Sequence, residues 1–322
     1  MRIPGFSFLV ILVILGLTIS PFNAVNAQQE AQFSHNMFNN MGVNPGYAGL
    51  RNAICATALA RQQWVGLRDA NGARVNPETY SLTVDAPIPF LKGGLAIGFM
   101  QDQLGFETNV GVKIAYSYHL PLDFGKLGLG GQIGFLDKRV DFGKFEPITP
   151  GDPVLIGGEE SHMFTDFALG AFYQAHNQAF AGLSVSQVRQ AGGYLGESDY
   201  RLRRHVFATA GYQYTLPSNP AYTLSPSTLI KTDLRSVQFD INTLVTYNNR
   251  FWGGVSYRPQ DAVVILLGVN YEQISIGYSY DLTTSQLGRT GRSFGSHEIM
   301  LRYCFELDLD KIQEIQRNIR FL

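Results

Sequence analysis

The chain has 322 residues, with 25 lysines and arginines against 26 aspartates and glutamates, so its formal net charge is −1. This balance excludes the basic excess that attracts nucleic acid, and two cysteines are too few for a disulfide framework. The 34 glycines, 22 phenylalanines and 16 tyrosines are more typical of a β-barrel than of a helical enzyme.

Residues 1–27 have the pattern of a secretory signal peptide. Arg2 supplies the positive start, an apolar run follows from Phe8 to Ile19, and Val25-Asn26-Ala27 precedes a cut before Gln28. The run is short for a membrane helix, which needs about 20 residues. Since no helical span is apparent after Gln28, a membrane protein of this sequence would have to be a closed barrel.

Residues 28–51 are irregular and rich in asparagine and glycine, as in Asn44-Pro45-Gly46. Proline and glycine at this density argue against regular structure. We expect a periplasmic N-terminal segment that enters the barrel mouth in part.

Alternation of apolar and polar residues dominates the chain from residue 52 to residue 306. In the run 236–247, apolar side chains fall at every second position from Val237 to Tyr247, with Gln238, Asp240 and Asn242 between them. A period of two predicts strands with two different faces. About fourteen such runs occur, at 52–63, 77–87, 93–102, 108–119, 126–138, 163–174, 178–186, 203–215, 221–231, 236–247, 250–258, 262–269, 272–280 and 297–306.

The lengths of the connections support a membrane barrel. The four long connections, 64–76, 139–162, 187–202 and 281–296, all follow odd-numbered strands, and the connections after even-numbered strands are short. Outer-membrane barrels have short periplasmic turns and long outer loops. The sequence therefore predicts an all-β, transmembrane antiparallel barrel of about fourteen strands, of the outer-membrane type, over residues 52–306, with both termini in the periplasm.

Residues 307–322 form a tail after the last strand, in which isoleucines recur at helical spacing. We expect either a docking element for a periplasmic partner or a short helix folded back over the barrel mouth. The candidate contact residues in this tail are Ile312, Ile315, Ile319, Arg320, Phe321 and Leu322.

Motifs for catalysis or cofactor binding are weak in this sequence. The six histidines are scattered without metal-ligand spacing, and the glycines at 128, 130 and 134 lie within a strand pattern, where they are expected to let the backbone bend. His205 with Ser186, or His297 with Ser296, would be the pairs of an outer-membrane hydrolase, but no nucleophile elbow accompanies them. We expect no catalytic, metal or cofactor-binding residues.

Charged residues on the polar faces of the strands are expected to point into the lumen, because facing lipid would cost about 2–4 kcal/mol for a lysine or arginine. They would build either a selective channel or a salt-bridged interior, and their mixed signs favour the second, since charge-selective pores use rings of one sign. The candidates are Asp85, Lys113, Asp166, Lys231, Asp240, Glu298 and Arg302.

The two cysteines lie near the periplasmic ends of the first and last strands. Because these strands must pair to close the barrel, we expect Cys55 and Cys304 to be neighbours. The periplasm permits oxidation, whereas cross-strand geometry does not always suit a disulfide, so the sequence leaves that bond open.

Short motifs lie in order along nearly the whole mature chain. They are Gln32-Phe33-Ser34, Asn44-Pro45-Gly46-Tyr47-Ala48-Gly49, Arg61-Gln62-Gln63-Trp64-Val65-Gly66, the run 205–212, Ser225-Pro226-Ser227, Leu229-Ile230-Lys231, the run 253–258, Asp261-Ala262-Val263-Val264, Gly277-Tyr278-Ser279-Tyr280-Asp281, the run 295–301 and Arg320-Phe321-Leu322. With these motifs the chain resembles the PorP/SprF-like family of outer-membrane proteins in the type IX secretion system of Bacteroidota.

The resemblance implies a non-enzymatic barrel needed to secrete, or to hold at the surface, a partner protein that crosses the type IX translocon. In gliding species such partners are large adhesins. Periplasmic secretion or envelope proteins would be further partners, and no nucleic acid is expected. A porin or solute channel is the alternative. The long loops would contact the secreted protein, and the candidates in 187–202 are Arg189, Tyr194, Tyr200 and Arg201, because tyrosine and arginine are enriched at hot spots.

Overall fold

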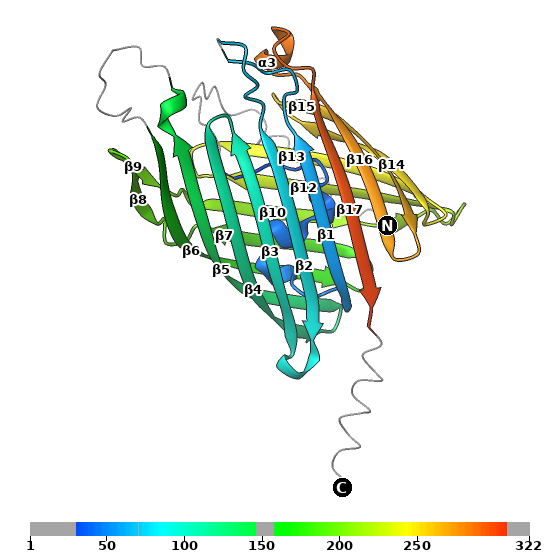
Figure 1. Ribbon diagram of the computed structural model, residues 1–322. Coiled ribbons are helices and arrows are strands. Elements are labelled where there is room, and N and C mark those ends of the chain that lie inside the picture. Colours follow the sequence, from blue (N-terminus) through cyan, green and yellow to red (C-terminus); the bar gives the residue numbers. More distant parts are fainter. Residues whose placement is uncertain (1–29, 70, 146–157, 308–322) are drawn as a thin grey trace.

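The computed structural model describes residues 30–69, 71–145 and 158–307, and these form a closed antiparallel barrel of fourteen long strands (Figure 1). The long strands are β1 (Ala53–Gln62), β2 (Glu78–Ile88), β3 (Gly93–Leu104), β4 (Glu107–Leu122), β5 (Gly125–Asp141), β6 (Glu159–Ala175), β7 (Ala179–Ser186), β10 (His205–Tyr212), β12 (Tyr222–Thr232), β13 (Val237–Tyr247), β14 (Phe251–Arg258), β15 (Ala262–Tyr271), β16 (Ile274–Thr283) and β17 (Ser296–Glu306).

Each long strand pairs with its neighbours along the chain, and β1 pairs with β17 to close the barrel. The register of this seam runs from Ala53 opposite Glu306 to Gln62 opposite His297. Within the ring every strand is paired on both sides, so the backbone groups of that part are satisfied within the wall, whereas β6 pairs with β7 only from Leu169 to Gln174 and extends above it. The predicted fold class and the number of strands are confirmed.

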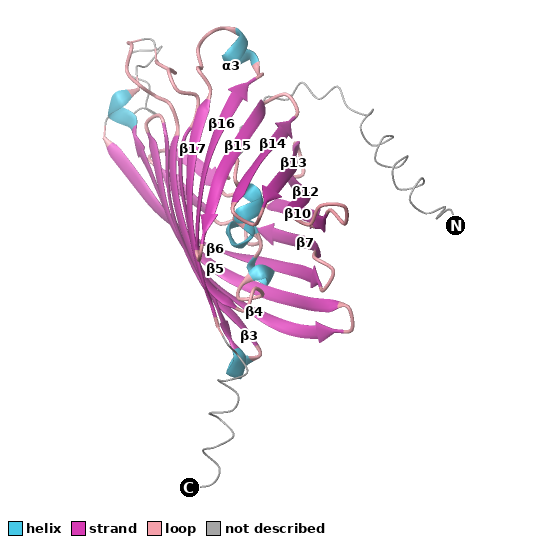
Figure 2. Cartoon of the chain, turned by 90° about the vertical axis from the view of Figure 1, so that its right-hand side faces the viewer, coloured by secondary structure: helices cyan, strands magenta, loops and turns pink. Residues whose placement is uncertain are grey.

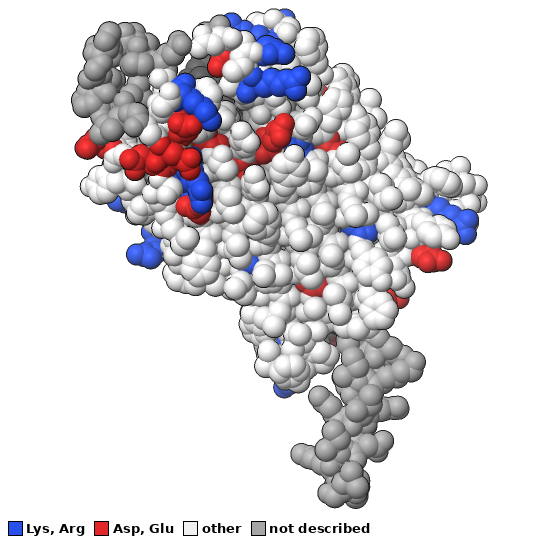
Figure 3. Space-filling model, viewed as in Figure 1, with Lys and Arg blue, Asp and Glu red and all other residues white. Residues whose placement is uncertain are grey.

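The outward face of the wall is apolar. The exposed large side chains alternate along the strands, as Ile97 and Phe99 do on β3 and Ile299 and Leu301 do on β17. Figure 3 shows the charged side chains gathered mainly toward the end with the long loops and a broad uncharged surface below. Such an apolar band is what lipid requires. None of the helices in the described ranges is long and apolar enough to span a membrane.

The connections between β1 and β2, β7 and β10, and β16 and β17 lie at one end of the barrel, together with the ends of β5 and β6 that precede and follow the fourth long connection, and this is the outer end in the expected orientation (Figure 1). The connection after β7 carries a small hairpin of β8 (Gly192–Leu195) and β9 (Ser198–Arg201). The remaining short elements are η1 (Asn36–Phe38), α2 (Asn40–Val43), η2 (Pro45–Tyr47), η3 (Pro89–Leu91), η4 (Phe142–Lys144), β11 (Tyr214–Thr215) and α3 (Gln286–Arg289).

The height of the wall is uneven. Strands β4, β5 and β6 have 16, 17 and 17 residues, whereas β7 and β10 have 8 each. A spanning strand needs about 9–11 residues, so the long strands continue past the outer membrane surface. The β8–β9 hairpin packs against the outer part of β6, above the short strands, where Gly193 lies against the His162 ring.

Cys55 on β1 lies directly opposite Cys304 on β17, and the two form a disulfide with a Cα–Cα distance of 4.1 Å. The two cysteines are therefore neighbours across the seam, as expected, and they form the disulfide that the sequence left open.

Candidate functional site

Residues 30–52, which we call the plug, lie inside the barrel. Their short helical pieces η1, α2 and η2 occupy the middle of the lumen (Figure 2). Ser34, His35 and Asn44 are almost completely buried. The expectation of a periplasmic segment that enters the mouth only in part is corrected here, because its polar groups bond to the lumen wall.

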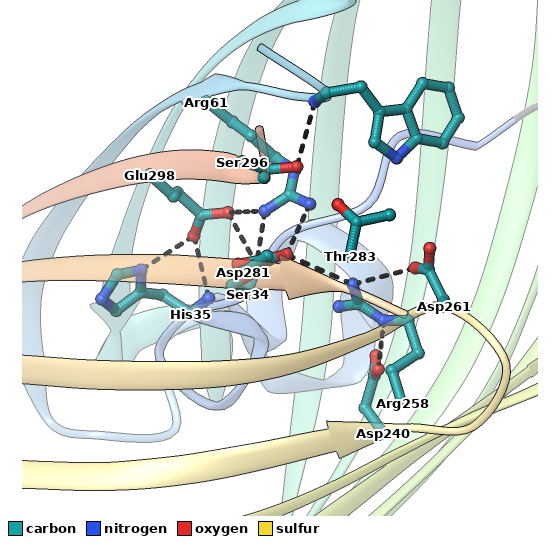
Figure 4. A network of polar contacts seen from close by, with 12 residues as sticks. Ser34, His35, Arg61, Asp240, Arg258, Asp261, Asp281, Thr283, Ser296 and Glu298 are labelled. Carbon is teal, nitrogen blue, oxygen red and sulfur yellow. Dashed lines mark hydrogen bonds and ion pairs between the residues drawn. The ribbon is translucent and has the colours of Figure 1, made fainter. Parts of the chain in front are cut away.

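The outer end of the plug is held by a buried carboxylate on β17 (Figure 4). Glu298 accepts hydrogen bonds from the backbone N–H of Ser34 at 2.7 Å and of His35 at 2.8 Å, and its Oε1 lies 2.8 Å from His35 Nδ1. Arg61 of β1 donates to Ser34 Oγ at 2.7 Å, to Glu298 at 3.1 Å and to Asp281 of β16 at 2.8 Å. Ser34 Oγ in turn donates to Asp281. One arginine thus joins two wall carboxylates and the plug.

A second buried arginine extends this network along the wall. Arg258 of β14 donates to Asp240 at 2.6 Å and to Asp261 at 3.2 Å, and it lies 3.5 Å from Asp281 (Figure 4). Asn36 of the plug donates to Asp240 at 3.4 Å. The guanidinium groups of Arg61 and Arg258 are out of contact with water. Removing one partner of such a buried pair is strongly destabilising, because it leaves an uncompensated charge.

The inner half of the plug is held by one hydrogen bond to a carboxylate, from Gly49 to Asp85, and by several neutral ones. Asn44 donates to the carbonyls of Ala171 at 3.0 Å and Leu183 at 3.3 Å. Ser117 donates to the Gly46 carbonyl at 2.9 Å, and Ser184 donates to the Val43 carbonyl at 2.6 Å. These contacts fix the plug to β2, β4, β6 and β7.

Glycines of the wall make room for this close approach. A Cβ atom built on Gly128 or Gly130 of β5 would collide with the backbone of Gly46 or Pro45, and one on Gly170 of β6 would collide with Asn44. The expectation that Gly128 and Gly130 let the strand bend is replaced by this packing reason. Glycine is required there because another backbone passes against the strand.

The plug separates the lumen into an outer and an inner part. The outer cavity has a volume of about 460 Å³ and is lined by β3 to β7, by the connection that carries the β8–β9 hairpin, and by Glu30. On the inner side, cavities of about 620 Å³ and 380 Å³ lie between the plug and the strand ends near Asn270 and Gln174. Buried ion pairs and packed backbone lie between the two parts.

The sequence of this plugged barrel matches a known protein family. Residues 25–303 match the family described as type IX secretion system membrane protein PorP/SprF. The chain belongs to this family. Among curated proteins, none matches the chain.

Solved barrels resemble this PorP/SprF chain in fold only. The outer membrane protein Omp33 of Acinetobacter baumannii is 11% identical, with a TM-score of 0.42 over 80% of this chain and 100% of that one. The TodX deltaS2S3 mutant, a monoaromatic hydrocarbon channel, is 9% identical, with a TM-score of 0.45 over 79% of this chain and 90% of that one. Barrel and family together place the chain in the outer membrane.

The charges predicted for the lumen of this PorP/SprF barrel all lie on the inner face of the wall. Asp240 and Glu298 belong to the buried network, and Asp85 accepts a hydrogen bond from the Gly49 N–H at 3.0 Å. Asp166 accepts from the backbone N–H groups of Arg189 and Ala191, and so fixes the start of the outer connection. The others are Lys113 at the outer cavity, Arg302 at the inner cavity and the buried Lys231.

The partner-contact candidates of the outer connection differ in exposure. Tyr194 is 69% exposed at the hairpin, and Arg189 and Arg201 are exposed as well. Tyr200 is instead half-buried, with its ring 5.7 Å from that of Phe164 and below the Lys138 ammonium. The candidates Ile312, Ile315, Ile319, Arg320, Phe321 and Leu322 lie outside the described residues, as does the predicted signal peptide.

The two serine–histidine pairs considered for hydrolysis are engaged elsewhere. Ser186 donates to Gln187 at 2.6 Å, and His205 Nδ1 lies 2.9 Å from the Arg203 carbonyl. Ser296 accepts from Trp64 N–H, and His297 Nδ1 lies 2.7 Å from the Tyr278 hydroxyl. Within the described ranges, no group of three or more His, Cys, Asp or Glu residues could hold a metal ion.

Of the wall groups that hold the plug, the sequence singled out Asp85, Asp240 and Glu298 as lumen charges, but not the arginines or Asp281. Ser34, Arg61, Arg258 and Asp281 entered only as parts of family motifs. One signal was present: Arg61 shares the inward face of β1 with Thr57 and Leu59, close to the strand end. A charge at that place on a lumen face requires a partner.

Proposed function

We propose that this barrel is a non-enzymatic outer-membrane component of the type IX secretion system that is needed to secrete a partner protein or to hold it at the cell surface. A large adhesin of the gliding type is the partner class that best fits the family. The observation that carries the proposal is the plug inside the lumen, which Ser34 bonds to Glu298 and Asp281, and Asn36 bonds to Asp240. A barrel plugged in this way suits a binding platform.

The alternative, a porin or solute channel, fits the lumen less well. Selective pores present rings of one charge sign to a continuous path. Here Arg61 and Arg258 are paired with carboxylates and have no contact with water. Solutes would have to displace the plug and break these pairs, so we favour the secretion role.

The two ends of the barrel would serve different partners. On the outer side, the exposed Tyr194, with Arg189 and Arg201, offers side chains that are common at protein interfaces. On the inner side, β17 ends at Glu306, and residues 307–322 would contact the envelope part of the secretion machinery. The secreted protein and the periplasmic proteins would thus meet at one barrel.

The proposal is tested by affinity purification of the tagged protein from cross-linked outer membranes. We expect one large secreted surface protein together with periplasmic secretion proteins. Truncation after residue 306 should lose the periplasmic proteins and keep the surface protein. A full-length variant with Ile312, Ile315 and Ile319 changed to serine is the matched control for tail length, and it should behave as the truncation does.

Two results would contradict the proposal. Recovery of the barrel alone, with no surface protein lost from cells that lack it, would remove the secretion role. A defect limited to the uptake of a small solute in those cells would favour the channel instead.

A further inference from the structure

We propose that the outer cavity is a binding site for a small amphipathic molecule with an apolar body and a carboxylate head, whose head pairs with Lys113. The secretion role does not depend on this site, so either proposal can fail without the other. The cavity of about 460 Å³ lies within the range of about 300–1,000 Å³ that is usual for small-molecule sites.

One side of the cavity is apolar. Met100 and Leu104 of β3, Leu136 of β5, Phe164 of β6 and Leu202 after β9 line it. Phe164 and Leu202 are only 2% and 4% exposed, so this wall is packed and preformed. An apolar body that enters the cavity would therefore meet a rigid surface and displace water from it.

Glycines leave the deep part of the cavity open, although no neighbouring atom there would exclude a side chain. A Cβ atom at Gly134 of β5 would meet nothing closer than 3.8 Å, and one at Gly111 of β4 nothing closer than 3.6 Å. This differs from Gly128 and Gly130 on the same strand, where the plug excludes any side chain. Glycine weakens a strand interior. Its use at 111 and 134 is explained if the space is needed by an occupant.

Lys113 lies in the middle of this open row. The residues paired with Lys113 on the neighbouring strands are Gly98 on β3 and Gly134 on β5. Because glycine has no side chain, neither of these residues covers the aliphatic part of the lysine side chain. Within the described part of the chain, its ammonium makes no hydrogen bond and no ion pair, and Glu30, which also lines the cavity, is near enough for the Lys113 charge to lower the pKa of its carboxyl group.

The acids that line the cavity already have partners. Glu107 pairs with Lys138, Asp102 accepts from Thr79 at 2.6 Å, and Asp166 accepts from two backbone N–H groups. Glu30 accepts from Gln187. A Lys113 ammonium beside an apolar wall, with the nearby acids occupied, fits a ligand carboxylate that can accept its protons.

The test uses the full barrel in nanodiscs with 4-phenylbutyrate as the probe and 4-phenylbutanol as its neutral analogue, followed by isothermal titration calorimetry. We expect the wild type to bind the carboxylate more tightly than the alcohol. Lys113→Gln should weaken carboxylate binding about tenfold and leave alcohol binding unchanged, because only the charge-assisted bond is lost. Lys126→Gln, at the opposite end of the lumen, should not change binding.

A cavity-filling variant tests the location. Gly134→Leu should abolish binding of both probes, whereas Gly131→Leu, which projects from the same strand into lipid, should bind as the wild type does. Heat-modified mobility on denaturing gels shows that each variant is folded. Failure of the wild type to bind the carboxylate, or equal affinity in the wild type, Lys113→Gln and Gly134→Leu, would overturn the proposal.

Discussion

Glu298 shows how one residue can fix a plug to a barrel wall. Both of its oxygens are used: Oε1 accepts from the His35 N–H, and Oε2 accepts from the Ser34 N–H and Arg61. Two of its donors are backbone N–H groups and a third is the planar guanidinium of Arg61, and all three need an acceptor. A carboxylate accepts from all of them, whereas an amide would turn its own N–H donors toward some of them.

Glu298→Gln is therefore expected to destabilise the protein strongly. The amide leaves Arg61 with a single carboxylate partner in a buried site and places N–H against N–H at the plug. Breaking one side of a buried pair costs roughly 3–5 kcal/mol. Urea unfolding followed by intrinsic fluorescence measures this loss. Glu306→Gln, on the exposed end of the same strand, should stay within about 0.5 kcal/mol of the wild type. Equal losses in the two variants would show that Glu298 has no special role.

A pH effect is expected at the start of the plug. Burial raises the pKa of Glu30, but the charges of Lys113 and His205 and the hydrogen bond from Gln187 outweigh it and lower the pKa from 4.5 to about 2. A lowered pKa means that the ionised carboxylate stabilises the folded state relative to the protonated carboxyl group. The stabilisation is therefore complete above about pH 4.5 and is lost as the pH falls toward 2.

Thermal unfolding between pH 5 and pH 2, about the span of that titration, measures this effect. The melting temperature of the wild type should fall more steeply than that of Glu30→Gln, which has no carboxylate to protonate. Parallel curves for the two proteins would contradict the assignment.

At the scale of elements, the strands were predictable and the plug was not. Alternation with period two fixes strand faces locally, and connection lengths fix which end is the outer one, so the fourteen strands follow from short stretches of sequence. The plug has no such period. Its conformation is set by partners far along the chain, as Asn44 is by Ala171 at a separation of 127 residues. Prediction from short stretches of sequence therefore gives residues 30–52 as an irregular loop.

The glycines of β5 allow a matched test of the plug contacts. Gly130→Val should push the plug away from the wall, because its side chain would occupy the place of Pro45, whereas Gly134→Val has room. Hydrogen exchange of the amides in residues 30–52 should accelerate in the first variant and stay as in the wild type in the second. Similar exchange in both would mean that the plug tolerates side chains on β5.

The seam between β1 and β17 is expected to survive without its disulfide. Its register is continuous from Ala53 to Gln62, so reduction removes one cross-link from a fully paired ladder. We expect Cys55→Ser to fold with a loss of about 2–5 kcal/mol. Heat-modified gel mobility and urea unfolding, each with and without reductant, check this. A Cys55→Ser protein that fails to close would show that the bond defines the seam.

At the scale of the whole molecule, the sequence predicted a salt-bridged interior from the mixed signs of its lumen charges, and the structure has one. The sequence did not predict which segment of the chain these charges hold in the lumen. The wall supplies Asp240, Asp281 and Glu298, and the plug supplies Ser34 and His35. A pattern of single strands contains no information on which segment crosses the lumen between them.

Conductance in planar bilayers shows whether the plug closes the lumen. We expect the wild-type barrel to show no steady ion conductance and Gly130→Val, with its plug displaced, to conduct. Gly134→Val should remain closed. A steady, porin-like conductance from the wild-type protein would mean that the plug leaves the lumen open, and the channel would then be the better description of the molecule.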